Sequence, residues 1–210
     1  KLQELIFYGL LGAIVGGRAG YMIFYNLYEL IQNPLSIFFI WEGGLSFHGG
    51  LLGVLLFIYI FSKSKWQMSF FESTDFIAPA VPIGLGSVRI GNFLNSELLG
   101  RPTDLPWGVI FPSDPLGLTR HPSQLYQAFS EGIILLTFLL WFSKKERPLK
   151  SISSFFLIGY GILRFITEFF REPDAHIGFD FLEFLTRGQI LCIPMVLIGI
   201  MILFTSHKKV

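Results

Sequence analysis

Cysteine and charged residues are both scarce in this chain. Its 210 residues include a single cysteine, Cys192, so an intramolecular disulfide is excluded. Charged residues make up only 15% of the chain and hydrophobic residues 52%, whereas a typical soluble domain carries roughly 25% charged residues. The mean hydropathy of +0.58 points the same way. This composition excludes an ordinary soluble domain and indicates a membrane protein.

Several motifs that would specify a chemistry are also missing. No spacing of histidine, cysteine and carboxylate residues fits a metal site, so we expect no metal. There is no Gly-x-Ser-x-Gly elbow for serine chemistry, and no internal repeat relates the two halves. We also expect no cleavable signal peptide, because residues 1–4 are too short for a charged n-region and no small-residue cleavage site follows the first apolar run.

Long, continuous apolar runs are what the chain does have, and they predict helices rather than the short alternating segments of a membrane β-barrel. We expect an all-α, polytopic transmembrane helical bundle that forms a single integral membrane domain over residues 1–210. The six predicted spans cover approximately residues 5–27, 45–61, 76–93, 122–142, 152–170 and 189–204. Between them, the loops 28–44, 95–120 and 171–188 share one side of the membrane, and we expect 95–120 to be structured.

The lysines assign the two sides of the membrane. Every lysine falls on the side opposite those three loops, at positions 1, 63, 65, 144, 145, 150, 208 and 209. Because cytoplasmic loops carry an excess of Lys and Arg, this side is predicted to be cytoplasmic. The three loops are therefore predicted to face outward.

Small residues and prolines predict how the first three spans are built. Glycines recur four residues apart in the first span, at 12, 16 and 20, and in the second, at 49 and 53. This spacing is typical of closely packed membrane helices. Residues 66–75 read as a short amphipathic piece, and the two prolines in the span that follows, at 79 and 82, predict a kinked or irregular helix.

The stretch 84–100, GLGSVRIGNFLNSELLG, concentrates polar residues at the end of the third predicted span. It contains Arg89, Asn92, Asn95 and Glu97. An ionisable side chain within a membrane is costly, so it is a functional-site hypothesis by default. For Arg89 taken alone, an ion pair that fixes helix packing explains the residue equally well. The recurrence of polar residues near the same membrane face favours function.

Arg164, Glu168 and Arg171 lie at i, i+4 and i+7 in and after the fifth span, which predicts one shared helix face. A self-neutralising Arg–Glu pair explains Glu168 but leaves Arg89 unexplained. Two arginines near the outer face could instead clamp a phosphate, because guanidinium groups match phosphate oxygens and stay charged when poorly hydrated. At that depth, the most abundant phosphate belongs to a phospholipid headgroup.

The remaining polar residues of the spans allow more than one interpretation. His48, at the outer end of the second span, is either a hydrogen-bonded packing residue or a general base. Glu131 lies deep in the fourth span, where we expect it to pair with Arg18 and hold helices together. His121 starts the fourth span with Gln124 and could line the site or cap the helix; the sequence does not decide.

Five long motifs resemble those of a known family. The segment GLGSVRIGNFLNSELLGR (84–101) is similar to the signature of the bacterial prolipoprotein diacylglyceryl transferases. The other four motifs follow the order of that family: GGRAGY (16–21), SFHGGLLG (46–53), RHPSQLYQAFSEG (120–132) and GYGILRFITEFFREPDA (159–175). Together they cover nearly the whole chain.

The resemblance implies a multi-pass protein of the bacterial cytoplasmic (inner) membrane with its active site toward the outer face. Such an enzyme moves the diacylglyceryl group of phosphatidylglycerol to the lipobox cysteine thiol of a prolipoprotein and releases glycerol 1-phosphate. It implies no cofactor and no nucleic-acid partner. The family has a further span, with a functionally implicated tyrosine, before the one that comes first here, so we expect that seventh span to be missing from this chain.

The expected site residues combine this resemblance with the polar pattern. We assign His48 as the candidate base, Arg89 and Arg164 as the phosphate clamp, and Arg18, His121 and Glu131 as supporting residues. Substrate-binding residues, in addition to Arg89, are expected to be Asn92, Asn95, Glu97, Gly100 and Glu168. The alternatives are a small transporter or lipid-flipping protein, and a structural membrane subunit. In the structural subunit, replacing Arg89 would damage folding as much as activity.

Overall fold

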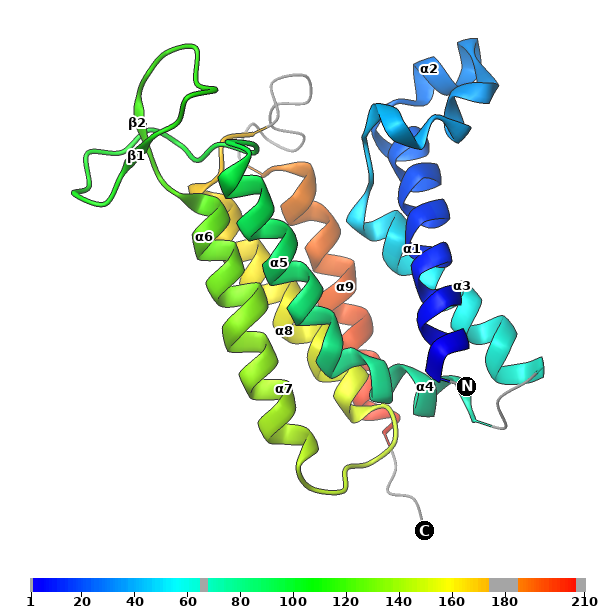
Figure 1. Ribbon diagram of the computed structural model, residues 1–210. Helices are drawn as coiled ribbons and strands as arrows, with labels where there is room; N and C mark the ends of the chain where they lie inside the picture. The colour runs from blue at the N-terminus through cyan, green and yellow to red at the C-terminus, as the bar shows by residue number, and fades with distance from the viewer. Residues whose placement is uncertain (1, 65–67, 174–184, 207–210) are drawn as a thin grey trace. The chain divides into compact units, whose positions relative to one another are not determined.

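The computed structural model describes residues 2–64, 68–173 and 185–206 of the chain (Figure 1). These residues form two compact units, Lys1–Thr74 and Asp75–Val210, and each unit is described by itself. The single membrane domain over residues 1–210 stays a prediction.

The first unit is a pair of helices, α1 (Leu2–Tyr25) and α3 (Phe47–Ser64), joined by three short helical segments. These segments are α2 (Leu27–Gln32), η1 (Pro34–Phe38) and η2 (Ile40–Glu42). The two long helices touch through their glycines: a Cβ added at Gly12 would lie 2.8 Å from the carbonyl oxygen of Gly53. The close packing predicted from the glycine spacing is confirmed, because side chains at these positions would collide with backbone.

The second unit is a bundle of apolar helices that run side by side (Figure 1). Its elements are the end of α4 (Phe70–Ile77), η3 (Ala78–Ala80), α5 (Val81–Leu94), α6 (Ser123–Gln127), the π-helical segment η4 (Ala128–Ile134), α7 (Leu135–Ser143), α8 (Ser151–Thr167), η5 (Glu168–Phe170) and α9 (Arg187–Phe204). Cys192 of α9 is buried and unpaired, as expected for a small apolar residue.

Most of the predicted spans appear as long apolar helices. Within the described residues, five helices have the length and apolar composition to cross a membrane: Gln3–Tyr25, Phe70–Leu94, Ser123–Ser143, Ser151–Phe170 and Arg187–Phe204. The sixth predicted span corresponds to a shorter apolar helix, Phe47–Ser62. The all-α, polytopic helical membrane fold is therefore confirmed.

The third span differs from its prediction at its beginning. Its helix starts at Phe70, so the separate amphipathic piece at 66–75 is wrong from Phe70 onward, and residues 66 and 67 lie outside the described part. The expected irregularity is confirmed, because the helix tightens into a 3₁₀ turn around Pro79 before α5 begins. Proline cannot donate the hydrogen bond of a regular α-helical turn.

The loop at 95–120 is structured, as predicted. It contains a two-stranded antiparallel ladder of β1 (Val109–Ile110) and β2 (Thr119–Arg120), which extends beyond the end of the bundle where α6 begins (Figure 1). The Asp114 carboxylate accepts hydrogen bonds from Arg120 Nε at 2.8 Å and Arg120 Nη2 at 3.1 Å. Two backbone amides of the same loop also donate to it.

This ion pair has an electrostatic consequence. The hydrogen bonds from Arg120 lower the pKa of Asp114 to about 2 from its usual 3.8, against a smaller opposing effect of burial. The same hydrogen bonds raise the pKa of Arg120. Arg120 Nη1 also donates to the carbonyl oxygen of Gly100 at 3.0 Å, which ties the loop to the segment that follows α5.

Candidate functional site

The C-terminal end of α8 places three charged side chains on one face, as the spacing predicted. Arg164 Nη2 lies 2.6 Å from Glu168 Oε2, and Arg171 Nη1 lies 3.4 Å from Glu168 Oε1. The Thr186 hydroxyl, which also caps α9, donates to Glu168 Oε1 at 3.1 Å. Glu168 is therefore held by two guanidinium groups and a hydroxyl, and its position is strongly fixed.

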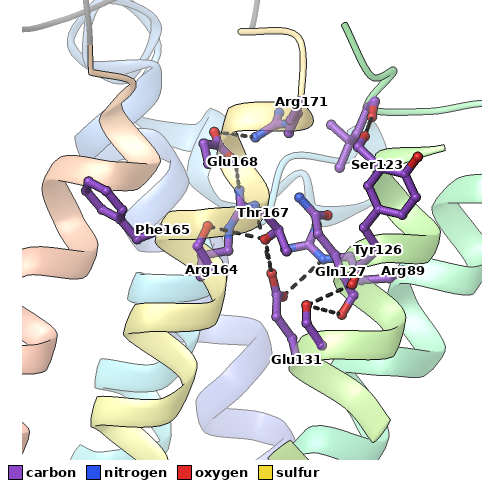
Figure 2. Close-up of polar contacts among 12 residues, drawn as sticks. Arg89, Ser123, Tyr126, Gln127, Glu131, Arg164, Phe165, Thr167, Glu168 and Arg171 are labelled. Carbon is purple, nitrogen blue, oxygen red and sulfur yellow. Dashed lines mark hydrogen bonds and ion pairs between the residues drawn. The ribbon is translucent and has the colours of Figure 1, made fainter. Parts of the chain in front are cut away.

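Glu131 lies between the two arginines that were expected to form a clamp (Figure 2). It is fully buried, with its Oε2 3.5 Å from Arg89 Nε and its Oε1 3.9 Å from Arg164 Nη1. The Thr167 hydroxyl donates to the same Oε1 at 3.2 Å. The carboxylate therefore bridges an arginine of α5 and an arginine of α8.

Local backbone geometry explains why Glu131 and Arg89 meet. Glu131 belongs to the π-helical segment η4, and such segments frequently occur at functional sites because they rotate a side chain out of α-helical register. Next to it, Gly132 packs on Gly86 of α5, where an added Cβ would lie 2.9 Å from the Gly86 Cα. The two glycines let the backbones approach, so an arginine one turn along α5 reaches the carboxylate.

The expected pairing of Glu131 with Arg18 is wrong. Both oxygens of Glu131 face Arg89 and Arg164 in the second unit. Arg18, in the first unit, is 4% exposed and donates to the carbonyl oxygens of Gly43 and Ser36. It thus ties the short helical segments after α1 to that helix, and its charge is spent on backbone groups.

The cluster of charges in the second unit carries an excess of positive charge. Three guanidinium groups, Arg89, Arg164 and Arg171, share two carboxylates, Glu131 and Glu168. Within the described residues, Arg164 Nη1 is buried and makes no hydrogen bond, because its distance to Glu131 is too long for one. A buried donor on a positive group favours binding of an anion.

The signature residues that follow Arg89 form the outer end of the site. Asn92 Nδ2 donates to Glu97 Oε2 at 3.0 Å, and the Glu97 amide donates to the Asn92 carbonyl oxygen at 2.8 Å. Asn95 caps the C-terminal end of α5 and is exposed. These residues were expected to bind substrate, and that role stays a prediction.

Gly100 lies where three segments cross. It forms an isolated β-bridge with Arg171, and a Cβ added to it would lie 2.9 Å from the His121 carbonyl carbon. A side chain at position 100 would therefore force the segment away from Arg171. This placement gives Gly100 a structural role that is separate from any contact with substrate.

The two candidate histidines lie in different units. His48 stands at the beginning of α3 in the first unit, with its ring 5.5 Å from that of Phe47. His121 lies in the second unit, where its Nδ1 is 3.2 Å from the Tyr126 hydroxyl. Its ring also meets Phe170 edge-on, so it joins the start of α6 to the end of η5. The role of His48 as a base stays a prediction.

Two residues of this region were not expected from the sequence. Thr167 donates to Glu131, and Gln127 of α6 is 1% exposed and lies beside Arg89 and Glu131 (Figure 2). A signal for Gln127 existed, because it stands four residues before Glu131 in the motif that begins RHPSQLY. Within the described residues, no group of three or more His, Cys, Asp or Glu side chains is placed to hold a metal ion.

Comparison with known proteins agrees with this site. The model of the family described as prolipoprotein diacylglyceryl transferase matches residues 1–205. The phosphatidylglycerol–prolipoprotein diacylglyceryl transferase of Teredinibacter turnerae is 54% identical over 207 residues, which cover 99% of this chain and 72% of that protein. The protein of the same name from Pseudomonas putida is 52% identical, covering 100% of this chain and 78% of that protein. The one from Acinetobacter baumannii is 49% identical, covering 99% and 77%.

Proposed function

Because the chain belongs to the prolipoprotein diacylglyceryl transferase family, we propose that it transfers the diacylglyceryl group of phosphatidylglycerol to the lipobox cysteine thiol of a prolipoprotein. Glycerol 1-phosphate is the leaving group. The chain is a transferase with several apolar helices that suit a multi-pass membrane protein. Membership of this family sets aside the transporter and the purely structural subunit.

The observation that carries the proposal for the site is the positive excess around Glu131. Arg89 and Arg164 approach this carboxylate from two different helices, and Arg164 keeps a buried donor without a hydrogen bond to any described residue. A phosphate that enters beside Glu131 satisfies this donor and neutralises the excess charge. Glu131 then acts as a spacer that sets the distance between the two guanidinium groups.

The reaction makes a specific demand on these arginines. The cysteine sulfur attacks the glycerol carbon of the lipid that carries the phosphate, so a C–S bond forms while the C–O bond breaks. The electron pair of the broken bond stays on the phosphate oxygen, and the phosphate gains negative charge. Donors that already point at this position stabilise the transition state more than the bound lipid.

The thiol proton must leave before or during attack, because the thiolate is the nucleophile. The positive excess of the arginine cluster favours a thiolate nearby. His48 remains our candidate for the base that takes the proton. Both substrates are held by a bilayer, and we propose that this bilayer is the bacterial inner membrane, with the site toward its outer face as the lysine distribution indicates.

The experiment that tests the proposal follows release of glycerol phosphate. Full-length protein in vesicles of phosphatidylglycerol receives a lipobox peptide, and a matched peptide with serine in place of cysteine is the control. We expect release only with the cysteine peptide, and its loss in Arg89→Ala protein that remains folded and membrane-inserted. Release from the serine peptide, or full activity of Arg89→Ala, would contradict the proposal.

A further inference from the structure

Two buried amide side chains near the outer end of the site each present an oxygen without a donor. Asn92 Oδ1 on α5 and Gln124 Oε1 on α6 are buried, and neither accepts a hydrogen bond from the described residues. Gln124 is completely buried as a residue. Buried polar atoms nearly always have a partner in folded proteins, so two such acceptors in one place point to a ligand that supplies donors.

Glu97 fixes the orientation of both amides. Gln124 Nε2 donates to the Glu97 carbonyl oxygen at 2.6 Å, and Asn92 Nδ2 donates to Glu97 Oε2 at 3.0 Å. Both Glu97 atoms can only accept hydrogen bonds, so the NH₂ group of each amide must face Glu97. The two amide oxygens must then point elsewhere, and rotation of either amide would put two acceptors against each other.

The backbone around Glu97 is specialised for this task. Ser96 and Leu98, on either side of it, have φ angles of 55° and 54°. Residues other than glycine rarely adopt this left-handed region, and a branched side chain such as leucine is unfavourable there. The strained turn directs both the main-chain oxygen and the carboxylate of Glu97 to the amides, and such strain is concentrated at functional sites.

The two acceptors lie one helical turn from the arginines. Asn92 follows Arg89 by three residues on α5, so both side chains share a face, and Asn92 stands about 4.5 Å farther along the helix axis. On α6, Gln124 precedes Gln127 by three residues, and Gln127 lies beside Arg89 and Glu131 (Figure 2). The acceptors are therefore on the loop side of the anion site, at roughly the length of a glycerol chain.

We propose that Asn92 and Gln124, oriented by Glu97, accept hydrogen bonds from the two hydroxyl groups of the phosphatidylglycerol headgroup. The proposal rests on the function proposed above, because it takes the phosphate to lie at Arg89 and Arg164. The lipid then stands with its terminal glycerol toward the loop at 95–120 and its acyl chains toward the bilayer. Selection of a diol headgroup follows from leaving these two acceptors unpaired when a hydroxyl is absent.

A pair of lipids tests this assignment without any change to the protein. The first is phosphatidylglycerol, and the second is an analogue whose headgroup lacks one hydroxyl group. With a cysteine-containing lipobox peptide, we expect kcat/KM of the wild-type protein to favour phosphatidylglycerol by about tenfold or more. Equal kcat/KM values for the two lipids would overturn the proposal.

Three variants then locate the preference. In Gln124→Met and Asn92→Leu we expect the ratio of kcat/KM values to fall to near one. Gln189→Met is the matched control, because Gln189 is also fully buried but both of its amide atoms are satisfied, by Phe165 O and Thr186 N. Its ratio should stay at the wild-type value, even if it folds less well.

These outcomes separate the two proposals. A residue with a merely structural role lowers kcat/KM for both lipids alike, so an unchanged ratio in Gln124→Met and Asn92→Leu would overturn the diol assignment alone. Activity that does not require Arg89 would instead remove the anion site on which the assignment rests.

Discussion

The second unit contains two groups of buried charges that differ in how completely they are satisfied. In the loop at 95–120, the Asp114 carboxylate receives two short hydrogen bonds from Arg120 and two more from backbone amides. In the helical bundle, the ion pairs of Glu131 with Arg89 and Arg164 are longer, at 3.5 and 3.9 Å.

The difference separates a structural ion pair from a binding site. The loop pair closes its own hydrogen bonds, so it has little capacity for a ligand and serves to order the chain. The cluster in the bundle has more guanidinium groups than carboxylates and a buried donor on Arg164 that no described residue accepts. An incompletely satisfied buried group is costly, and a ligand that completes it gains that free energy on binding.

The largest effect should come from removing the arginine with the unused donor. We expect Arg164→Ala to lower kcat by about 10²- to 10³-fold, the usual loss when one stabilising donor leaves a transition state. Arg164→Lys should recover only part of this, because an ammonium group cannot bind two oxygens side by side. Steady-state kinetics in vesicles measure both, and a fully active Arg164→Lys would show that charge alone suffices.

A smaller effect on rate is expected from the spacer. Glu131→Gln keeps the shape of the side chain but removes its charge, so the two guanidinium groups lose their common partner. We expect kcat to fall by about 10- to 100-fold through misplacement of the phosphate, without a rise in KM, because the positive excess grows. Stability should fall by about 3 kcal/mol, since breaking a buried pair leaves uncompensated charge.

Kinetics and thermal unfolding of the same Glu131→Gln sample check both parts. A higher KM with unchanged kcat would assign Glu131 to ground-state binding of the lipid and contradict its role as a spacer.

The smallest effect on catalysis is expected in the loop. Asp114→Asn should change kcat little but lower the unfolding temperature at neutral pH. Because the folded pKa of Asp114 is lowered to about 2, its stabilisation is present above the ordinary pKa of 3.8 and is lost as pH falls toward 2. The unfolding temperatures of wild type and variant should therefore converge between about pH 4 and pH 2. A gap that persists at pH 2 would contradict the ion pair as the cause.

The sequence alone predicts the parts of this account that depend on local spacing. The apolar runs predict the helices, the glycines four apart predict the contact of α1 and α3, and the i, i+4 spacing predicts the pair of Arg164 and Glu168. Each follows from the period of one helix or from the fixed geometry of neighbouring turns.

The parts that failed depend on contacts between helices. Glu131 was expected beside Arg18, because both are charges deep in a span, but the π-helical turn and the contact of Gly86 with Gly132 bring it to Arg89 instead. No periodicity marks a π turn in advance. The orphan oxygen of Gln124 is likewise invisible in sequence, since it depends on the carbonyl orientation of Glu97 in another segment.

The most direct test of the central claim is equilibrium binding of glycerol 1-phosphate to full-length protein in detergent. It presents the phosphate without the lipid and without the reaction. We predict that wild type and Asp114→Asn bind it with the same Kd, and that Arg89→Ala and Arg164→Ala each bind it at least tenfold more weakly, which corresponds to about 1.4 kcal/mol. Equal Kd values in all four proteins would show that the positive excess around Glu131 does not hold the phosphate.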